Sequence, residues 1–207
     1  MKLKGFTLAE LFITLGIIGL VAEMTIPALI KSTQDAVLKT TWKKEYSVFS
    51  QATMMAISDN GGSLYGVCTN NNACLRDLYF NYLNYSKKCE DAQSFGVCWH
   101  AEGSTKLLNG TPIPNAGWDW YNCAGGILNN GALILINGGD CSPICGMISV
   151  DINGFKGPNV IGKDLFMITI YENKLVPFGA PGYYGDSWAW SNCTYAGFSC
   201  GAKYLSE

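Results

Sequence analysis

The longest apolar run of the chain lies near its start, from Phe6 to Ile30. It carries no charged residue between positions 11 and 22. At about 1.5 Å per helical residue, the run is long enough to cross a bilayer core of about 30 Å. The pattern therefore predicts a transmembrane helix over residues 6–30.

Beyond this run the apolar positions recur at helical steps, which predicts an amphipathic continuation of the same helix. No helix-breaking sequence occurs before Asn60-Gly61-Gly62, so we expect the helix to end near Ser58. The alternative is a membrane anchor followed by a separate core helix. The expected core-facing positions are Leu29, Val37, Thr41, Val48, Ala52 and Met55 or Ala56.

Short apolar runs between turn residues predict an antiparallel sheet of three to four strands in the second half of the chain. A short helix is expected over Leu75–Tyr85, and the tail from Gly179 to Glu207 is expected to be a disulfide-tied loop. The last two strands read as a hairpin joined at Glu172-Asn173. The expected strands are Ala132–Ile136, Met147–Asp151, Phe166–Tyr171 and Lys174–Pro177.

Composition indicates one modest, loop-rich domain beyond the apolar run. Of 207 residues, 48% are hydrophobic and 14% are charged, which is typical of a β-rich rather than a charged helical domain. The net charge of −2 gives no basic surface for nucleic acid, so no nucleic-acid partner is expected.

All nine cysteines lie at or beyond Cys68, which suits a disulfide framework in an oxidising compartment. Close spacing favours four pairs and leaves Cys123 as the odd cysteine. No C-x-x-C pair occurs and His100 is the single histidine, so a zinc site is not indicated. The expected pairs are Cys68–Cys74, Cys89–Cys98, Cys141–Cys145 and Cys193–Cys200.

Glu10 is unusual because it lies inside the apolar run. An ionisable group in hydrocarbon costs at least about 2.5 kcal/mol and therefore needs a partner or a function. Cleavage between Gly5 and Phe6 creates a positive amine one helical turn before Glu10. Staggered helices of neighbouring copies then pair amine with carboxylate in a dry interior. On this interpretation the partner of Glu10 exists only after the leader is removed.

At these positions the sequence resembles the type IV pilin superfamily, which includes the pseudopilins of type II secretion. The resemblance implies cleavage after Gly5 by a prepilin peptidase, methylation of the Phe6 amine, and helix-to-helix packing in a filament. It further implies that Gly19 and Pro27 loosen the helix. The implied fold is pilin-like α+β, in which a long helix packs on a small antiparallel sheet with disulfide-rich loops. The matching residues are Lys2, Lys4, Gly5, Phe6, Thr7, Leu8 and Glu10.

The resulting organisation is a leader (1–5), a transmembrane and assembly helix (6–30) and a globular head (31–207). Lysines before the span predict a single pass through the inner membrane with the short N-terminus inside and the head exported. The expected destination is a periplasmic or cell-surface filament, as a pseudopilin or as a minor or major pilin subunit. The expected partners are other pilin-like subunits, the prepilin peptidase, membrane lipid and an inner-membrane assembly platform that supplies energy.

A different class of function also fits the sequence, namely a non-polymerising, membrane-anchored binding module. Its surface for a glycan or protein ligand would be aromatic, and the same aromatic residues also suit packing against disulfides. The residues concerned are Trp118, Trp120, Tyr121, Trp188 and Trp190.

Two further patterns concern metal binding and catalysis. Asp151, Asn153 and Asp164 lie in an oxygen-rich stretch that suits calcium, which some pseudopilins hold in a head loop. The alternative is a turn in which these side chains cap their own backbone. Cys98 and His100 place a thiol two residues from an imidazole, but sequence adjacency does not establish catalytic geometry, and no enzyme is expected.

Overall fold

The computed structural model describes residues 5, 7–90, 95–113, 123–182 and 193–207. The chain divides into two units, Met1–Val37 and Leu38–Glu207, and each is described by itself. Helix α1 (Leu8–Asp59) contributes residues to both units. The expected continuity of this helix as far as Ser58 is therefore confirmed.

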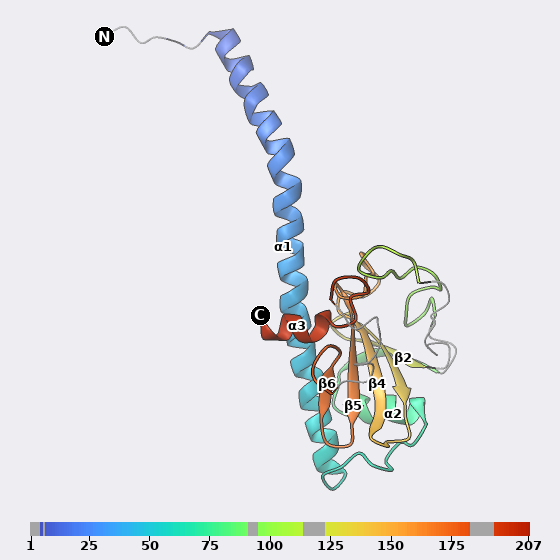
Figure 1. The fold of residues 1–207 in the computed structure, drawn as a ribbon. Coiled ribbons are helices and arrows are strands. Elements are labelled where there is room, and N and C mark those ends of the chain that lie inside the picture. The colour runs from blue at the N-terminus through green and yellow to red at the C-terminus, as the bar shows by residue number, and fades with distance from the viewer. Residues whose placement is uncertain (1–4, 6, 91–94, 114–122, 183–192) are drawn as a thin grey trace. The chain divides into compact units, whose positions relative to one another are not determined.

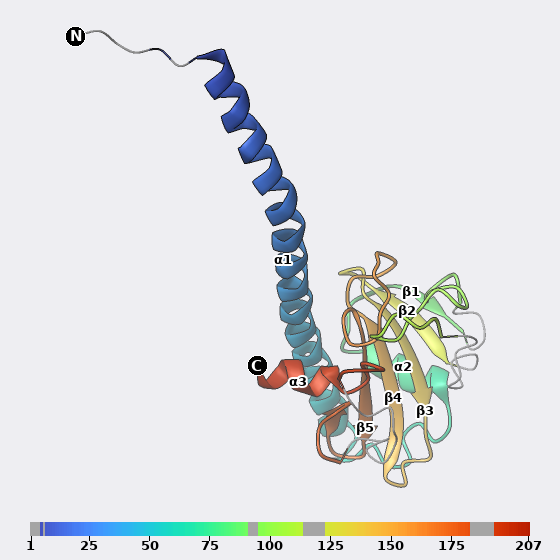
Figure 2. The same cartoon turned by 45° about the horizontal axis from the view of Figure 1, so that its top comes forward.

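The described part of the second unit holds a six-stranded antiparallel sheet whose strands lie side by side in chain order (Figure 2). Two shorter helices belong to the same unit, α2 (Asn72–Phe80) and α3 (Cys200–Ser206). The strands are β1 (Tyr85–Cys89), β2 (Ala124–Leu128), β3 (Leu133–Gly138), β4 (Ile144–Asp151), β5 (Leu165–Tyr171) and β6 (Leu175–Pro177).

The sheet is larger than the three or four strands expected. The four predicted strands correspond to β3, β4, β5 and β6, whereas β1 and β2 were not predicted. The helix expected to reach Tyr85 ends at Phe80, because Tyr85 begins β1 and pairs with Leu128. The tail also contains α3 in addition to the expected disulfide-tied loop.

The central strands of the sheet are buried on both faces, since successive strand residues point to opposite sides and most residues of β3 and nearly all of β5 are buried. On β3, Ile134 and Ile136 pack in one apolar cluster with residues of α1 and α2. Leu133 and Leu135 belong to a second cluster that is completed by residues from the 95–113 and 193–199 segments. Coverage on both sides explains why these strands read as continuous apolar runs.

The core-facing side of α1 in the second unit differs from the predicted one. Met55 is exposed and Val48 is half-buried, whereas Trp42 and Phe49 have no exposed surface. Leu29 and Val37, which belong to the first unit, are exposed as well. Ala52 and Ala56 are buried as predicted, but Trp42 and Phe49 were missed because the polar Glu45 lies between them on the buried side. The buried residues of α1 are Trp42, Glu45, Phe49, Ala52, Thr53 and Ala56.

Helix α3 crosses α1 within the second unit (Figure 1). The indole nitrogen of Trp42 donates to the carbonyl of Gly201 at 2.9 Å, and the indole ring stacks on Phe166 with centroids 4.3 Å apart. Lys39 forms an ion pair with Glu207 at 2.5 Å and lies over the ring of Tyr204. These contacts join α1 and α3 to strand β5.

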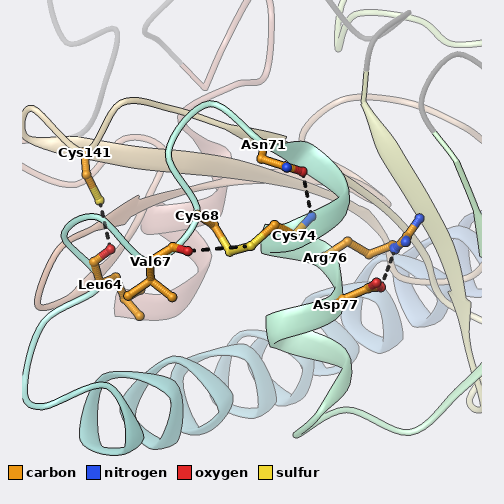
Figure 3. Close-up of a disulfide and its surroundings, with 8 residues drawn as sticks. All are labelled: Leu64, Val67, Cys68, Asn71, Cys74, Arg76, Asp77 and Cys141. Atoms are coloured by element: carbon orange, nitrogen blue, oxygen red, sulfur yellow. Dashed lines mark hydrogen bonds and ion pairs between the residues drawn. A yellow bond between two sulfur atoms is a disulfide. The ribbon is translucent and has the colours of Figure 1, made fainter.

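Four disulfides are present among the described residues, and they join the four pairs that the spacing predicts. Cys123 is buried and stands outside them. Beside the Cys68–Cys74 disulfide, the Asn71 side chain accepts from the backbone N–H of Cys74 and caps α2 (Figure 3). This corner holds α2 in place against β2 and β3.

The guanidinium of Arg76 lies in the same corner and is 2% exposed. It donates to the backbone carbonyl of Cys89 at 2.7 Å and to Asp77 at 2.9 Å. A buried charge needs partners, and these two bonds provide them. The bond to Cys89 joins α2 to the end of β1.

Candidate assembly site and the head loop

The first turn of α1 contains a capping box formed by Thr7 and Glu10. The backbone N–H and the hydroxyl of Thr7 both donate to Oε2 of Glu10, each at 2.8 Å. In return, the backbone N–H of Glu10 donates to the Thr7 hydroxyl at 3.3 Å. A threonine at the N-cap with a glutamate three residues later is the sequence signature of such a box. The motif explains why the helix begins at Leu8.

This geometry corrects one expectation. Glu10 was expected to acquire a partner only after cleavage behind Gly5. In the uncut chain Glu10 already accepts two hydrogen bonds from Thr7. Thr7 was not predicted as a partner of Glu10, because it carries no charge, although the T-x-x-E spacing of a capping box is present in the sequence. Phe6 lies outside the described residues, whereas Gly5 is described and exposed.

The first unit exposes apolar side chains on every side of its helix. A helix that is apolar all round is normally buried, in a large core or in a membrane. Within the described residues, α1 is the one helix long and apolar enough to cross a membrane, by length and composition. Its exposed large side chains in this unit are Leu8, Leu11, Phe12, Ile13, Leu15, Ile17, Ile18, Leu20, Val21, Met24, Ile26, Leu29, Ile30 and Val37.

Gly19 and Pro27 both lie within α1, which is helical through each of them. The loosening expected at these two residues stays a prediction. A Cβ placed on Gly19 would meet no atom within 4 Å, and the same holds for Gly16. Nothing in this chain's own packing requires glycine at either position.

The candidate calcium residues lie together where β4 leads into β5, since Asp151 ends β4 and Asn153 and Asp164 lie in the connecting loop. Asp151 and Asp164 have no exposed surface. Asp151 accepts from the backbone N–H of Asn153 at 3.0 Å, and its other oxygen lies 2.8 Å from Nε2 of His100. Burial raises the pKa of Asp151 to about 6, while the hydrogen bond from His100 opposes that shift. His100 was not predicted to belong to this cluster.

Asp164 also has its oxygens occupied by nitrogen donors. It accepts from the backbone N–H groups of Asn159 at 2.8 Å and Val160 at 2.7 Å. Burial raises the pKa of Asp164, and these backbone bonds oppose the rise. Asn153 turns its amide nitrogen, not its oxygen, toward Asp164 at 3.3 Å. The loop is thus closed by Asp and Asn side chains that bind the backbone.

This arrangement favours the turn-capping alternative over a calcium site. Among the described residues no group of three or more His, Cys, Asp or Glu side chains is suited to a metal ion. The two oxygens of the loop that remain buried without a hydrogen-bond partner are amide oxygens, Oδ1 of Asn153 and Oδ1 of Asn159. Calcium prefers several converging carboxylate and carbonyl oxygens, and here the carboxylates already bind N–H groups.

Two other predicted sites, the thiol–imidazole pair and the aromatic surface, are not found as sites among the described residues. The sulfur of Cys98 is bonded to Cys89, so Cys98 and His100 do not form a thiol–imidazole pair. The aromatic residues of the proposed binding surface, Trp118, Trp120, Tyr121, Trp188 and Trp190, lie outside the described residues.

Comparison with known proteins gives no relative: no family model, no curated protein and no solved structure matches this chain.

Proposed function

We propose that this chain is a structural subunit of a pilin-like filament, a pseudopilin or a minor pilin. Before assembly it spans the inner membrane once, with its lysine-bearing N-terminus inside and its disulfide-bonded part exported. A prepilin peptidase removes residues 1–5, the new amine of Phe6 is methylated, and an assembly platform moves the subunit from lipid into the filament. Other copies or related subunits then surround residues 6–30.

The observation that carries the proposal is the apolar surface around the whole circumference of α1 in the first unit. Monomeric soluble proteins rarely expose a continuous apolar surface of this extent, so lipid or other chains must cover it. The acid in the first turn of α1 is Glu10, and its pairing with a neighbour's amine would fix the register between copies.

Two further features support the proposal. Glycines at positions 16 and 19, with open space at each, suit close approach of neighbouring helices. Four disulfides between Cys68 and Cys200 suit an oxidising compartment and therefore export of the second unit.

Intact mass of the protein purified from its native membrane tests the processing step. The proposal predicts loss of Met1–Gly5 and gain of one methyl group. Retention of these five residues in the mature protein would count against the filament and in favour of an uncut anchor.

Replacement of Glu10 tests the assembly step. We expect Glu10→Ala to stay in the membrane and to be cleaved, but to enter filaments poorly, because no carboxylate remains for the amine. Leu20→Ala, which removes an uncharged group from the same helix, is the matched control. Normal incorporation of Glu10→Ala would remove the pairing from the proposal.

A further inference from the structure

A second acid, Glu23, lies within the apolar part of α1. Its side chain is exposed, and no residue in the described part of the chain forms a hydrogen bond or ion pair with its carboxylate. The residues within helical reach, three or four positions before and after it, are all uncharged. They are Gly19, Leu20, Ile26 and Pro27. This part of the helix therefore supplies no partner for the acid.

The backbone carbonyl of Glu23 lacks its helical donor as well. In an α-helix this oxygen accepts from the N–H four residues later, and that residue is Pro27, which has no N–H. One residue thus presents two kinds of acceptor, a carboxylate and a carbonyl, on an otherwise apolar surface. In surroundings without water, donors for these oxygens have to come from another molecule. An ammonium group, which carries three donors and a positive charge, suits them.

The chain carries a matching cation on the same side of the helix. Lys31 is the first cation after Glu23 in the sequence, and its exposed side chain forms no ion pair among the described residues. Glu23 and Lys31 are about 12 Å apart along the helix, too far to pair within one chain. Both belong to a ridge of α1 whose members follow one another at steps of four. The ridge consists of Gly19, Glu23, Pro27 and Lys31.

We propose that the carboxylate of Glu23 binds the ammonium group of Lys31 from a second copy of this chain. Two parallel helices offset by about 12 Å bring the acid of one beside the base of the other. The ridges then face each other, and the open space at Gly19 lets the second helix approach closely. This inference rests on the proposed filament and adds a contact that fixes the offset between two of its subunits. Each subunit of a helical array has several neighbours, so Glu10 and Glu23 can contact different ones.

The physical reason is the loss of water on assembly. In the single membrane-inserted chain, Glu23 lies about 22 Å from the start of α1, within the outer third of a core of about 30 Å. From there its side chain reaches water at the membrane edge. In a filament other helices surround this position and exclude that water, so a cation has to take its place.

The competing explanation is that no second chain is involved. Glu23 then stays hydrated in the filament, and the charge of Lys31 is balanced by Asp35, four residues further along the same helix. Asp35→Asn is therefore the matched control, because it removes an acid from the same unit without touching Glu23.

The first experiment measures incorporation into filaments when each variant is the sole copy of this chain. We expect Glu23→Gln and Lys31→Met each to enter filaments about tenfold less than the native chain, the effect of losing one hydrogen bond between charged groups. The double variant should be reduced no further than either single one, because neither leaves an unpaired charge. Asp35→Asn should stay within about twofold of the native level.

Intact mass confirms that each variant compared has been cleaved after Gly5. Normal incorporation of Glu23→Gln would overturn the inference, and so would losses that multiply in the double variant. A loss in Asp35→Asn as large as that in Lys31→Met would assign Lys31 to its own chain and overturn it too.

The second experiment reverses the charges and shows whether the pair joins two chains. Glu23→Lys alone and Lys31→Glu alone bring like charges together, so each should assemble about tenfold less than the native chain. Coexpression of the two variants should restore filaments that contain both, because the reversed charges then meet across chains. If the mixture fails while one chain carrying both reversals assembles, the pair is not intermolecular and the proposal is wrong.

The native chain and Glu10→Ala, measured in parallel, separate failure of this inference from failure of the proposed function. If the native chain stays uncut and forms no filament, the proposed function and the Glu23 contact fall together. If the native chain assembles and Glu10→Ala is impaired while Glu23→Gln assembles normally, only the Glu23 contact is wrong. If Glu23→Gln is impaired and Lys31→Met is normal, another subunit supplies the cation, which overturns the assignment to a second copy.

Discussion

Two phenylalanines of the same helix have opposite surroundings. Phe12, in the first unit, is 64% exposed, whereas Phe49, in the second, has no exposed surface. The sheet and α2 cover Phe49, whereas the described residues leave most of the Phe12 side chain exposed. The difference teaches that the second unit buries its apolar side of α1 with its own residues, while the first unit leaves its apolar side chains exposed.

The largest expected effect tests this contrast at the two phenylalanines. Phe49→Ala should lower the unfolding free energy of the second unit by about 3–5 kcal/mol, because it leaves a cavity in the core. Phe12→Ala, the matched control, should change it by less than about 0.5 kcal/mol. Denaturant titration in mild detergent, followed by near-ultraviolet circular dichroism, measures both. Equal effects would show that the two parts of α1 do not differ in this way.

The next largest change in unfolding free energy is expected from replacing a buried cation. Arg76 is 2% exposed and its partners belong to its own unit. Arg76→Met removes the donor to the Cys89 carbonyl and should lower the unfolding free energy by about 2 kcal/mol. Lys87→Met, at an exposed position of the adjacent strand, is the control and should have little effect. An unchanged midpoint for Arg76→Met would mean that water replaces the lost donor.

A smaller change in unfolding free energy is expected at Glu45, whose surroundings differ from those of Glu10 on the same helix. Oε1 of Glu45 accepts from the side-chain amide of Asn130 at 2.8 Å, but its Oε2 is buried without a partner. Burial chiefly raises the pKa of Glu45, whereas Glu10 keeps two donors from Thr7. Glu45→Gln should therefore stabilise the second unit by about 1 kcal/mol at neutral pH, because no buried charge remains.

The pH dependence of this variant has a definite sign. Because the pKa of Glu45 is higher in the folded than in the unfolded chain, the folded chain binds the extra proton. The native protein gains stability as pH falls from above the folded pKa toward the unfolded one. The advantage of Glu45→Gln should therefore shrink on acidification. Glu102→Gln, at an exposed position, serves as the control. If the stabilisation by Glu45→Gln did not change with pH, the ionisation of Glu45 would not be its cause.

Much of the fold could be predicted where one pattern dominated. The length of α1 followed from the lack of any break before Asn60, and β3 to β5 followed from branched apolar runs between turns. The four disulfides followed from spacing alone. In each case the local signal and the tertiary environment agree.

The rest depended on contacts that no local pattern reports. Strand β1 has a polar sequence because it lies at the edge of the sheet and is exposed, and β2 begins with Ala-Gly-Gly. At Gly126 a side chain would approach the ring of Phe80 to 2.3 Å, so glycine there reflects packing against α2. In the first turn of α1, Glu10 was noticed as a charge inside an apolar run, whereas the capping role of Thr7 became visible only from its hydrogen bonds with Glu10.

The smallest expected effect concerns calcium and the loop between β4 and β5. Since the oxygens of Asp151 and Asp164 already bind nitrogen donors, a calcium ion would have to displace bonds of 2.7–3.0 Å before it gained any ligand. Adding millimolar calcium to the chelator-treated protein should therefore raise its unfolding midpoint by less than about 1 °C. Magnesium at the same concentration controls for ionic strength. A rise of several degrees that is specific to calcium, and lost in Asp164→Asn, would show that the loop rearranges to bind the ion, with Asn153 turning its oxygen inward.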